Sequence, residues 1–467
     1  MLVKELRQGL RTNLFTTAFI LLQVFMVFTV FIGAAAEGDT RAVSGFFWFF
    51  LITTLLVAMP VRGFSALTSE LQLNTMDLIQ LTRLSAWRIT LGKWAALMSQ
   101  TTLLVISILP YLVMRYFFGG IDLIQEFLIL FFAFFASALL TALAVGFSAY
   151  RSVLVRSLIL GPAGLFSLSF VMSFSFAGAY GGRGIFGSGI TSPDFWWTAV
   201  TVIIAGLYAI YFLLDLGASQ IAPQAENHST RKRLITLIFV IAILSMAFTG
   251  VEEEIVMGLA AVAIVLVWID AITERPSVLP SVLQPFEKNR FLSITKYLLA
   301  PGWHTGILFV IISGLAFLSL VSVTTNLLST WTPKDLAEII SWGGAVTYPL
   351  IFIHLFIPNS KQMFGLYMLI QCCTFVVTLL ITFVSDAISN LSDILFFCFP
   401  IPAVSLAALS ETAGRNQPMY FLLASSIFTL LSLAIPFWRA WPLYRKMNAG
   451  TLPLNTKTEF KVDRLLR

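Results

Sequence analysis

The sequence predicts an all-α polytopic membrane protein of about twelve transmembrane helices, arranged as two six-span halves. Three observations predict this class. Hydrophobic residues make up 58% of the 467 residues and charged residues only 11%, whereas a soluble domain has roughly 45–50% and 25%. Apolar runs of about 20 residues, the length needed to cross a bilayer, recur along the chain. Aromatic residues, 14% of the chain, suit the interfacial belts of lipid-facing helices.

The apolar runs define twelve expected spans. The first follows Lys4, Arg7 and Arg11, as a secretory signal would, but its run of about 22 apolar residues exceeds the roughly 7–15 of a signal, so we expect it to remain uncleaved. The first six expected spans are 14–36, 43–61, 94–116, 124–147, 153–177 and 195–217. The second six are 234–250, 255–271, 304–326, 341–358, 363–384 and 419–436.

One further apolar stretch, 394–409, contains Pro400 and Pro402. If it crossed the membrane, the basic tail 437–467 would lie outside the cell. Helix-breaking prolines are tolerated at membrane depth where protein buries the freed backbone groups, so we expect a re-entrant segment. On that topology the inner segments carry 24 of the 29 Lys and Arg residues. This positive-inside bias predicts a multi-pass protein of the cytoplasmic (inner) membrane with both termini cytoplasmic.

The two sets of six spans share a plan. We expect a first half over 1–217, a second half over 218–436 and a cytoplasmic tail over 437–467. Each half begins with basic residues, has a short acidic outer loop and then has a long inner loop before its third span. The sequence shows no residue-by-residue repeat, so the similarity of plan alone predicts a parallel duplication of six spans.

Most sequence motifs for chemistry are missing. No P-loop pattern GxxxxGK[ST] occurs, and the GxGxxG pattern at 182–187 lies in an expected outer loop, not between a strand and a helix. The three cysteines cannot form a disulfide framework, and the three histidines are scattered. The sequence has no base-reading or phosphate-clamping cluster for nucleic acid. We therefore expect a protein that is not an enzyme and has no catalytic residues, metal or cofactor of its own.

Ionisable residues inside the expected spans are few. His354 lies within span ten, where we expect a hydrogen-bonded packing residue. Arg115 lies at the outer end of span three, where snorkelling to the interface would explain it, and Asp215 and Asp270 lie at inner ends of spans. Carriers coupled to protons or sodium keep Asp, Glu or His deep in the bilayer. Because the chain lacks such a set, it either conducts passively or takes energy from a partner.

The inner loop 62–93, which we call the coupling segment, is strongly patterned. Glu70 and Asp77, seven residues apart, share one helix face, and apolar residues lie on another. Ser85 can cap a new helix that begins at Ala86 and enters span three. A helix that only binds anionic lipid favours Lys and Arg. Since this segment mixes acids with bases, a docking surface for a cytosolic protein is favoured.

A second amphipathic element precedes the first span. Its leucines follow i, i+4 spacing, and its charged residues lie elsewhere around the helix. The leucines are Leu2, Leu6, Leu10 and Leu14, and the charged residues are Lys4, Glu5, Arg7 and Arg11. We expect residues 1–13 to form an elbow helix in the inner membrane interface.

The coupling segment is similar to that of type-2 ABC exporter permeases, whose pattern reads approximately E, then G-T-[LM]-[DE]-L-L, T-P-L-S and I-x-x-G-K. The matching residues are Glu70, Thr75, Met76, Asp77, Leu78, Thr82, Leu84, Ser85, Ile89, Gly92 and Lys93. Asn74 stands where glycine is usual, and Arg83 where proline is usual. The elbow helix also resembles the start of these permeases, whereas the second half resembles them in plan only.

The resemblance implies a permease subunit of an ABC transporter of the exporter type, which binds a separate cytosolic ABC ATPase in two copies. ATP would be bound by that partner. The resemblance also implies that the inner loop 272–303, with Glu274 and Arg275, is a second docking surface. The residues implied in coupling are Glu70, Thr75, Asp77, Thr82, Arg83, Ser85 and Lys93. Alternatively, two such chains could assemble.

Two other functions stay open. A twelve-span secondary carrier or facilitator would need coupling carboxylates in the bilayer or a charged GxxxD-type loop between spans two and three, and neither is evident. A membrane enzyme acting on lipid-linked substrates would need catalytic His, Asp or Glu clustered near an interface, and is less favoured. The sequence does not define the cargo, because a largely apolar interior suits lipids, hydrophobic drugs, peptides or a polymer.

Overall fold

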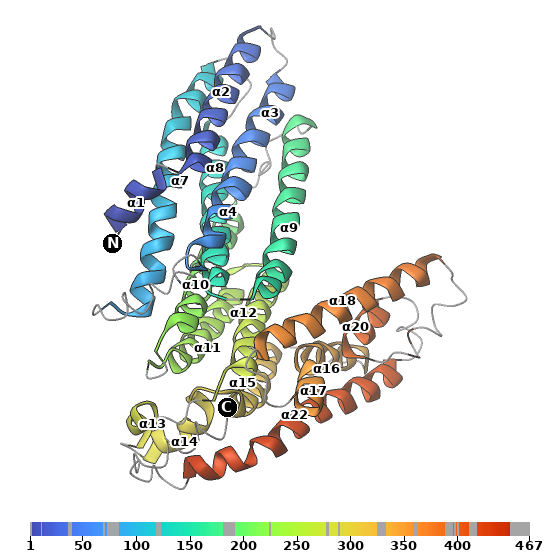
Figure 1. Cartoon of the computed structure of the whole chain (residues 1–467). Coiled ribbons are helices and arrows are strands. Elements are labelled where there is room, and N and C mark those ends of the chain that lie inside the picture. Colours follow the sequence, from blue (N-terminus) through green and yellow to red (C-terminus); the bar gives the residue numbers. More distant parts are fainter. Residues whose placement is uncertain are drawn as a thin grey trace. The chain divides into compact units, whose positions relative to one another are not determined.

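A computed structural model shows the described part of the chain as helices (Figure 1). It describes residues 2–10, 12–35, 40–68, 71, 84–117, 123–150, 152–180, 192–223, 226–276, 280–287, 290–324, 333–357, 363–387, 396, 398, 401–410 and 418–448, and no strand occurs among them. Twelve helices in this part of the chain are long and apolar enough to cross a membrane, and each overlaps one expected span. The predicted fold class, an all-α polytopic membrane protein of about twelve spans, is confirmed.

The chain divides into two compact units. Unit 1 comprises Met1–Ala222 and Met246–Glu252, and unit 2 comprises Pro223–Ser245 and Glu253–Arg467. The main helices of unit 1 are α1 (Leu2–Leu10), α2 (Asn13–Ala35), α3 (Thr40–Thr53), α4 (Met59–Val61), α7 (Ala86–Phe117), α8 (Leu123–Ser148), α9 (Val153–Tyr180) and α10 (Pro193–Ile221). Those of unit 2 are α11 (Ser229–Ser245), α12 (Glu253–Thr273), α13 (Pro280–Glu287), α14 (Arg290–Leu299), α15 (Trp303–Thr324), α16 (Pro333–Thr347), α17 (Pro349–Phe356), α18 (Met363–Ala387), α20 (Pro402–Ser410) and α22 (Pro418–Asn448).

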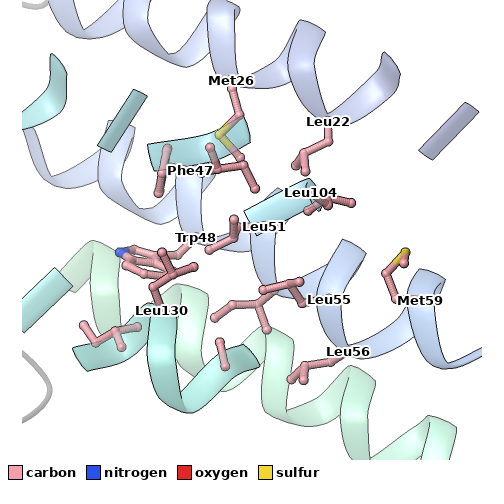
Figure 2. Packing of buried hydrophobic residues seen from close by; sticks show 14 of the residues in the cluster. Leu22, Met26, Phe47, Trp48, Leu51, Leu55, Leu56, Met59, Leu104 and Leu130 are labelled. Carbon is pink, nitrogen blue, oxygen red and sulfur yellow. The ribbon is translucent and has the colours of Figure 1, made fainter. Parts of the chain in front are cut away.

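Unit 1 has an apolar core between its first spans (Figure 2). Met26 of α2, Phe47 and Leu51 of α3, and Leu104 of α7 are fully buried there. By contrast, Phe31 of α2 is 69% exposed. In a membrane, where exposed apolar side chains contact lipid tails, such a surface is stable. The side chains of each span are therefore divided between a protein core and a lipid-facing surface.

The second span contains a break that a neighbouring helix repairs. Thr54–Ala58 form a π-helical turn, in which the Met59 amide donates to the Thr54 carbonyl. In this register the next carbonyl, that of Leu55, would pair with residue 60, but Pro60 has no N–H. Ser137 of α8 donates to the Leu55 carbonyl instead (2.7 Å). Hydroxyl groups of adjacent helices satisfy backbone groups freed by proline in this way.

Helices α8 and α10 approach closely because both carry glycine at their contact. A Cβ atom added at Gly146 would overlap the carbonyl oxygen of Leu213, and one added at Gly217 would lie 2.8 Å from the Cα atom of Gly146. Small residues allow such backbone approach in membrane helices, where packing rather than the hydrophobic effect drives association. The close contact fixes α8, which bears Ser137 and Ser148.

Unit 2 is centred on the pairing of α16 with α22. Ser341 and Ser425 hydroxyls lie 2.6 Å apart, and Thr347 and Ser432 hydroxyls lie 2.7 Å apart. All of these side chains are buried. Hydrogen bonds between hydroxyl side chains are a common link between membrane helices.

Two details concern the end of the chain. Helix α20 lies within the stretch expected to be re-entrant and packs against α16, α18 and α22. Its nine residues span about 14 Å, less than half of a bilayer core. Helix α22 continues to Asn448, beyond the expected span end at 436, so the start of the predicted tail 437–467 is helical.

Gly146→Ala is expected to destabilise the protein by about 1–3 kcal/mol, because the added methyl group meets the backbone of α10. The matched control is Gly164→Ala in α9, where an added Cβ atom meets nothing within 4 Å. Thermal unfolding of both variants in detergent measures the difference. Equal stability of the two variants would contradict the close contact.

Candidate functional site

The elbow helix α1 contacts both ends of the coupling segment. At the start of the segment, the Arg62 guanidinium donates to the Gly9 carbonyl (2.9 Å) and to the side chain of Gln100. At its end, the Lys93 ammonium lies 3.6 Å from the Glu5 carboxylate. Helix α1 also packs along α7 (Figure 1), so it contacts Arg62 and Lys93, the first and last residues of the coupling segment.

The start of the coupling segment is also tied to the turn between α8 and α9. Thr68 Oγ1 donates to the Ser148 carbonyl (2.5 Å) and accepts a hydrogen bond from Arg156 (2.9 Å). The Leu67 amide donates to Ser148 Oγ (3.2 Å). Thr68 and Ser148 are buried, so water competes little for these bonds. Contacts with α1, α7, α8 and α9 therefore hold the flanks of the coupling segment.

Of the residues predicted to transmit force, Ser85 and Lys93 lie in the described part of the chain. Ser85 is half-buried, and α7 begins directly after it at Ala86, as predicted. The Ser85 carbonyl accepts from the Ile89 amide (3.3 Å), and Lys93 is only 6% exposed. The other predicted residues lie outside the described residues: Glu70, Thr75, Asp77, Thr82 and Arg83.

The elbow residues are placed in part. Glu5 is half-buried and Arg7 is exposed, both on α1. Arg11 and the side chain of Lys4 lie outside the described residues. The amphipathic helix expected at the N-terminus thus forms over Leu2–Leu10.

Sequence reasoning missed the residues that join α1 to the coupling segment. Gln100, in the middle of α7, is 1% exposed. An amide in a membrane helix finds partners on neighbouring helices, so its position in span three was a usable signal. Arg62 was recognised only as one of the basic residues on the inner side. Its partners Gly9 and Gln100 lie 53 and 38 residues away in sequence, and no local pattern identifies them.

A buried ion pair lies at the opposite end of α7. We expected Arg115 to extend to the membrane interface, and this was wrong, since it is 3% exposed. Its guanidinium lies 3.0 Å from the Glu126 carboxylate, donates to Ser44 (2.8 Å) and stacks 4.0 Å from the Phe47 ring centroid. The connection between α7 and α8 is short enough to bring these charges together. Ion pairing and the aromatic face replace the water that snorkelling would have supplied.

Unit 2 pairs two cations of α11 with two acids at the end of α12. Lys232 Nζ lies 2.6 Å from the Asp270 carboxylate, and the Arg233 guanidinium lies 3.2 Å from the Glu274 carboxylate. Both cations are 1% exposed. Each buried positive charge therefore has a negative charge beside it, which offsets the cost of removing it from water.

Glu274, which the resemblance places in a second docking surface, is half-buried. Its carboxylate accepts from the Gly302 amide (3.1 Å) and the Ser229 hydroxyl, besides pairing with Arg233. The next residue, Arg275, is exposed. Two further charged residues of loop 272–303, Glu287 and Arg290, end α13 and begin α14, with side chains outside the described part of the structure. Lys288 lies outside the described residues.

His354 is a packing residue, as expected. It is 1% exposed and its ring centroid lies 4.5 Å from that of Trp303. The hydrogen bond that we expected is not found at Nε2 within the described structure. No group of three His, Cys, Asp or Glu side chains in that same part of the chain could hold a metal ion.

Comparisons with protein-family models, with curated proteins and with solved structures found no match to this chain. The main feature of the site is a charged segment whose flanks contact α1, α7, α8 and α9.

Arg115→Gln is expected to destabilise the protein by about 3–5 kcal/mol, because it leaves the buried Glu126 carboxylate without a compensating charge. The double variant Arg115→Gln/Glu126→Gln should recover most of that loss, since it buries no charge. Unfolding of both variants by denaturant in detergent measures the difference. A double variant no more stable than the single one would show that the two charges do not compensate each other.

Proposed function

We propose that this chain is the permease subunit of an ATP-driven ABC transporter of the exporter type, and that a separate cytosolic ATPase supplies the energy. The observation that carries the proposal is the bridging of both ends of the coupling segment by α1. A segment that received force while its flanks were loose would move alone. Here the flanks are fixed to α1, α7, α8 and α9, so a displacement of the segment would move those helices with it.

The distribution of charge supports the same function. In unit 1, Arg115 pairs with Glu126, and in unit 2, Lys232 pairs with Asp270. These charged residues of the spans therefore bind each other. A carrier driven by an ion gradient needs carboxylates that bind the coupling ion. Spans whose charges are paired in this way fit a transporter that takes its energy from a partner better than they fit a carrier driven by an ion gradient. The positive-inside bias places the coupling segment, α1 and both termini on the cytoplasmic side, where an ATPase is available.

In this proposal the chain supplies both permease halves and binds two ATPase copies. It binds no ATP and catalyses no reaction itself, and it functions in the cytoplasmic membrane. The coupling segment, with Glu70, Thr75, Asp77, Thr82 and Arg83, meets one ATPase copy. The loop 272–303 of unit 2 meets the other.

Asp77→Lys is expected to lower the amount of ATPase that copurifies with the chain by about tenfold, because it reverses a charge at the proposed contact. Glu252→Lys is the matched control. It makes the same change of charge at an exposed residue that the topology places on the outer side. Quantitative mass spectrometry of affinity-purified chain in detergent measures the ATPase retained.

Equal retention of ATPase by the two variants would show that Asp77 has no part in docking. A second result would replace the proposed function with a secondary carrier. This result is the accumulation of a lipophilic cationic dye, driven by a proton gradient without ATP, in liposomes that contain only this chain.

A further inference from the structure

Helix α14, in the inner loop of unit 2, ends against side chains of α11. The last carbonyls of a helix have no partner within the helix. Here the Arg233 guanidinium donates to the carbonyls of Leu298 (2.7 Å) and Ala300 (2.9 Å). Thr230 Oγ1 donates to the carbonyl between them, that of Leu299 (2.8 Å). Two residues in the first turns of α11 thus cap the C-terminal end of α14.

The same guanidinium reaches the ends of two further helices. It pairs with Glu274 at the end of α12 and donates to Thr305 Oγ1 at the start of α15 (3.1 Å). The Glu274 carbonyl in turn accepts from the Trp303 amide (2.9 Å). A planar guanidinium with five N–H groups is suited to such a junction, because it can hold several acceptors in fixed directions.

Gly302 allows the chain to turn at this junction. Its φ of +127° is rarely adopted by residues with a side chain, and an added Cβ atom would lie 2.9 Å from the Cα atom of Pro276. Its amide donates to Glu274 (3.1 Å). The path from α14 into α15 is therefore set by the same group of contacts around Arg233.

Helix α13 and helix α22 are attached to the junction as well. Leu283 of α13 packs with Ala300, and both are buried. Tyr297 of α14 lies 6.2 Å from Tyr444 of α22, ring centroid to ring centroid. The hairpin α13–α14 thus contacts the junction through Ala300 and contacts α22 through Tyr297.

We propose that Arg233 is a positioning residue that makes the α13–α14 hairpin move together with α11, α12 and α15. This inference rests on the proposed function, in which loop 272–303 is the second surface for the ATPase. Force applied to the hairpin by that partner would reach three spans through one buried side chain, which is 1% exposed. Arg233 itself would not touch the ATPase.

The test compares two charge-neutral double variants of the full-length chain in lipid nanodiscs. Arg233→Gln/Glu274→Gln removes the cap of α14 without leaving a buried charge unpaired. Lys232→Gln/Asp270→Asn removes the neighbouring pair, which joins α11 to α12. Hydrogen exchange of the backbone amides of 290–300 should be about tenfold faster in the first variant than in the second, because helix ends without caps fray.

Two further measurements separate positioning from stability. Arg233→Lys keeps the charge but lacks the planar group that reaches several carbonyls. This variant should therefore have the thermal stability of the natural chain, whereas its backbone amides of 290–300 should still exchange fast. In the Arg233→Gln/Glu274→Gln variant, the copurifying ATPase should be retained within about twofold of the control while its rate of ATP hydrolysis falls about tenfold.

Each alternative result contradicts a different part of the proposal: the cap, the positioning role or the proposed function. Equal exchange in the two double variants would overturn the cap. Fast exchange with unchanged ATP hydrolysis would overturn the positioning role and leave the proposed function standing. If no ATPase copurifies with the natural chain, the proposed function fails and the positioning role fails with it, whereas the exchange measurement still decides whether Arg233 holds α14.

Discussion

Charges in an apolar helix bundle are stable only when an opposite charge or several aligned hydrogen bonds accompany them. This constraint accounts for the polar contacts of both units. Arg115 lies between Glu126, Ser44 and the Phe47 ring at one end of α7, and Lys93 and Arg62 bind α1 at the other. In unit 2, Arg233 gathers acceptors from three helices. These charged residues thus join neighbouring helices, whereas apolar residues such as Phe47 and Leu104 form the core of unit 1.

The backbone imposes a second constraint, since no N–H or C=O group in lipid can pair with water. Pro60 interrupts the second span, and the Ser137 hydroxyl takes the place of the missing amide. The end of α14 shows the same principle outside the spans, because its last carbonyls bind Thr230 and Arg233. Where two helices must come closest, glycines such as Gly146 remove the side chain. Each of these solutions links two helices, so satisfying the backbone also fixes the packing of the spans.

The spans could be predicted from the sequence because hydropathy over about 20 residues is a local property. The start of α7 at Ala86 was predictable for the same reason, from Ser85 and the helical pattern after it. The contacts of buried charges were not local. Arg115 was expected at the interface, although Glu126, eleven residues later, was a signal for an ion pair between successive helices. Glu274 was grouped with exposed charges because its partners, Arg233 and Gly302, come from different helices. The structure therefore shows the contacts that hold the flanks of the coupling segment, whereas Glu70 to Arg83 are known from the sequence pattern alone.

The central claim is that this chain forms both halves of the membrane part and that a separate ATPase drives it. Native mass spectrometry of the complex, extracted gently from its membrane, tests this most directly. The account predicts one 51.7 kDa chain together with two copies of a second polypeptide that hydrolyses ATP, and a mass that falls in two steps as those copies dissociate. A chain that is recovered alone, or only with further copies of itself, and that still transports cargo in sealed vesicles without ATP would contradict the account.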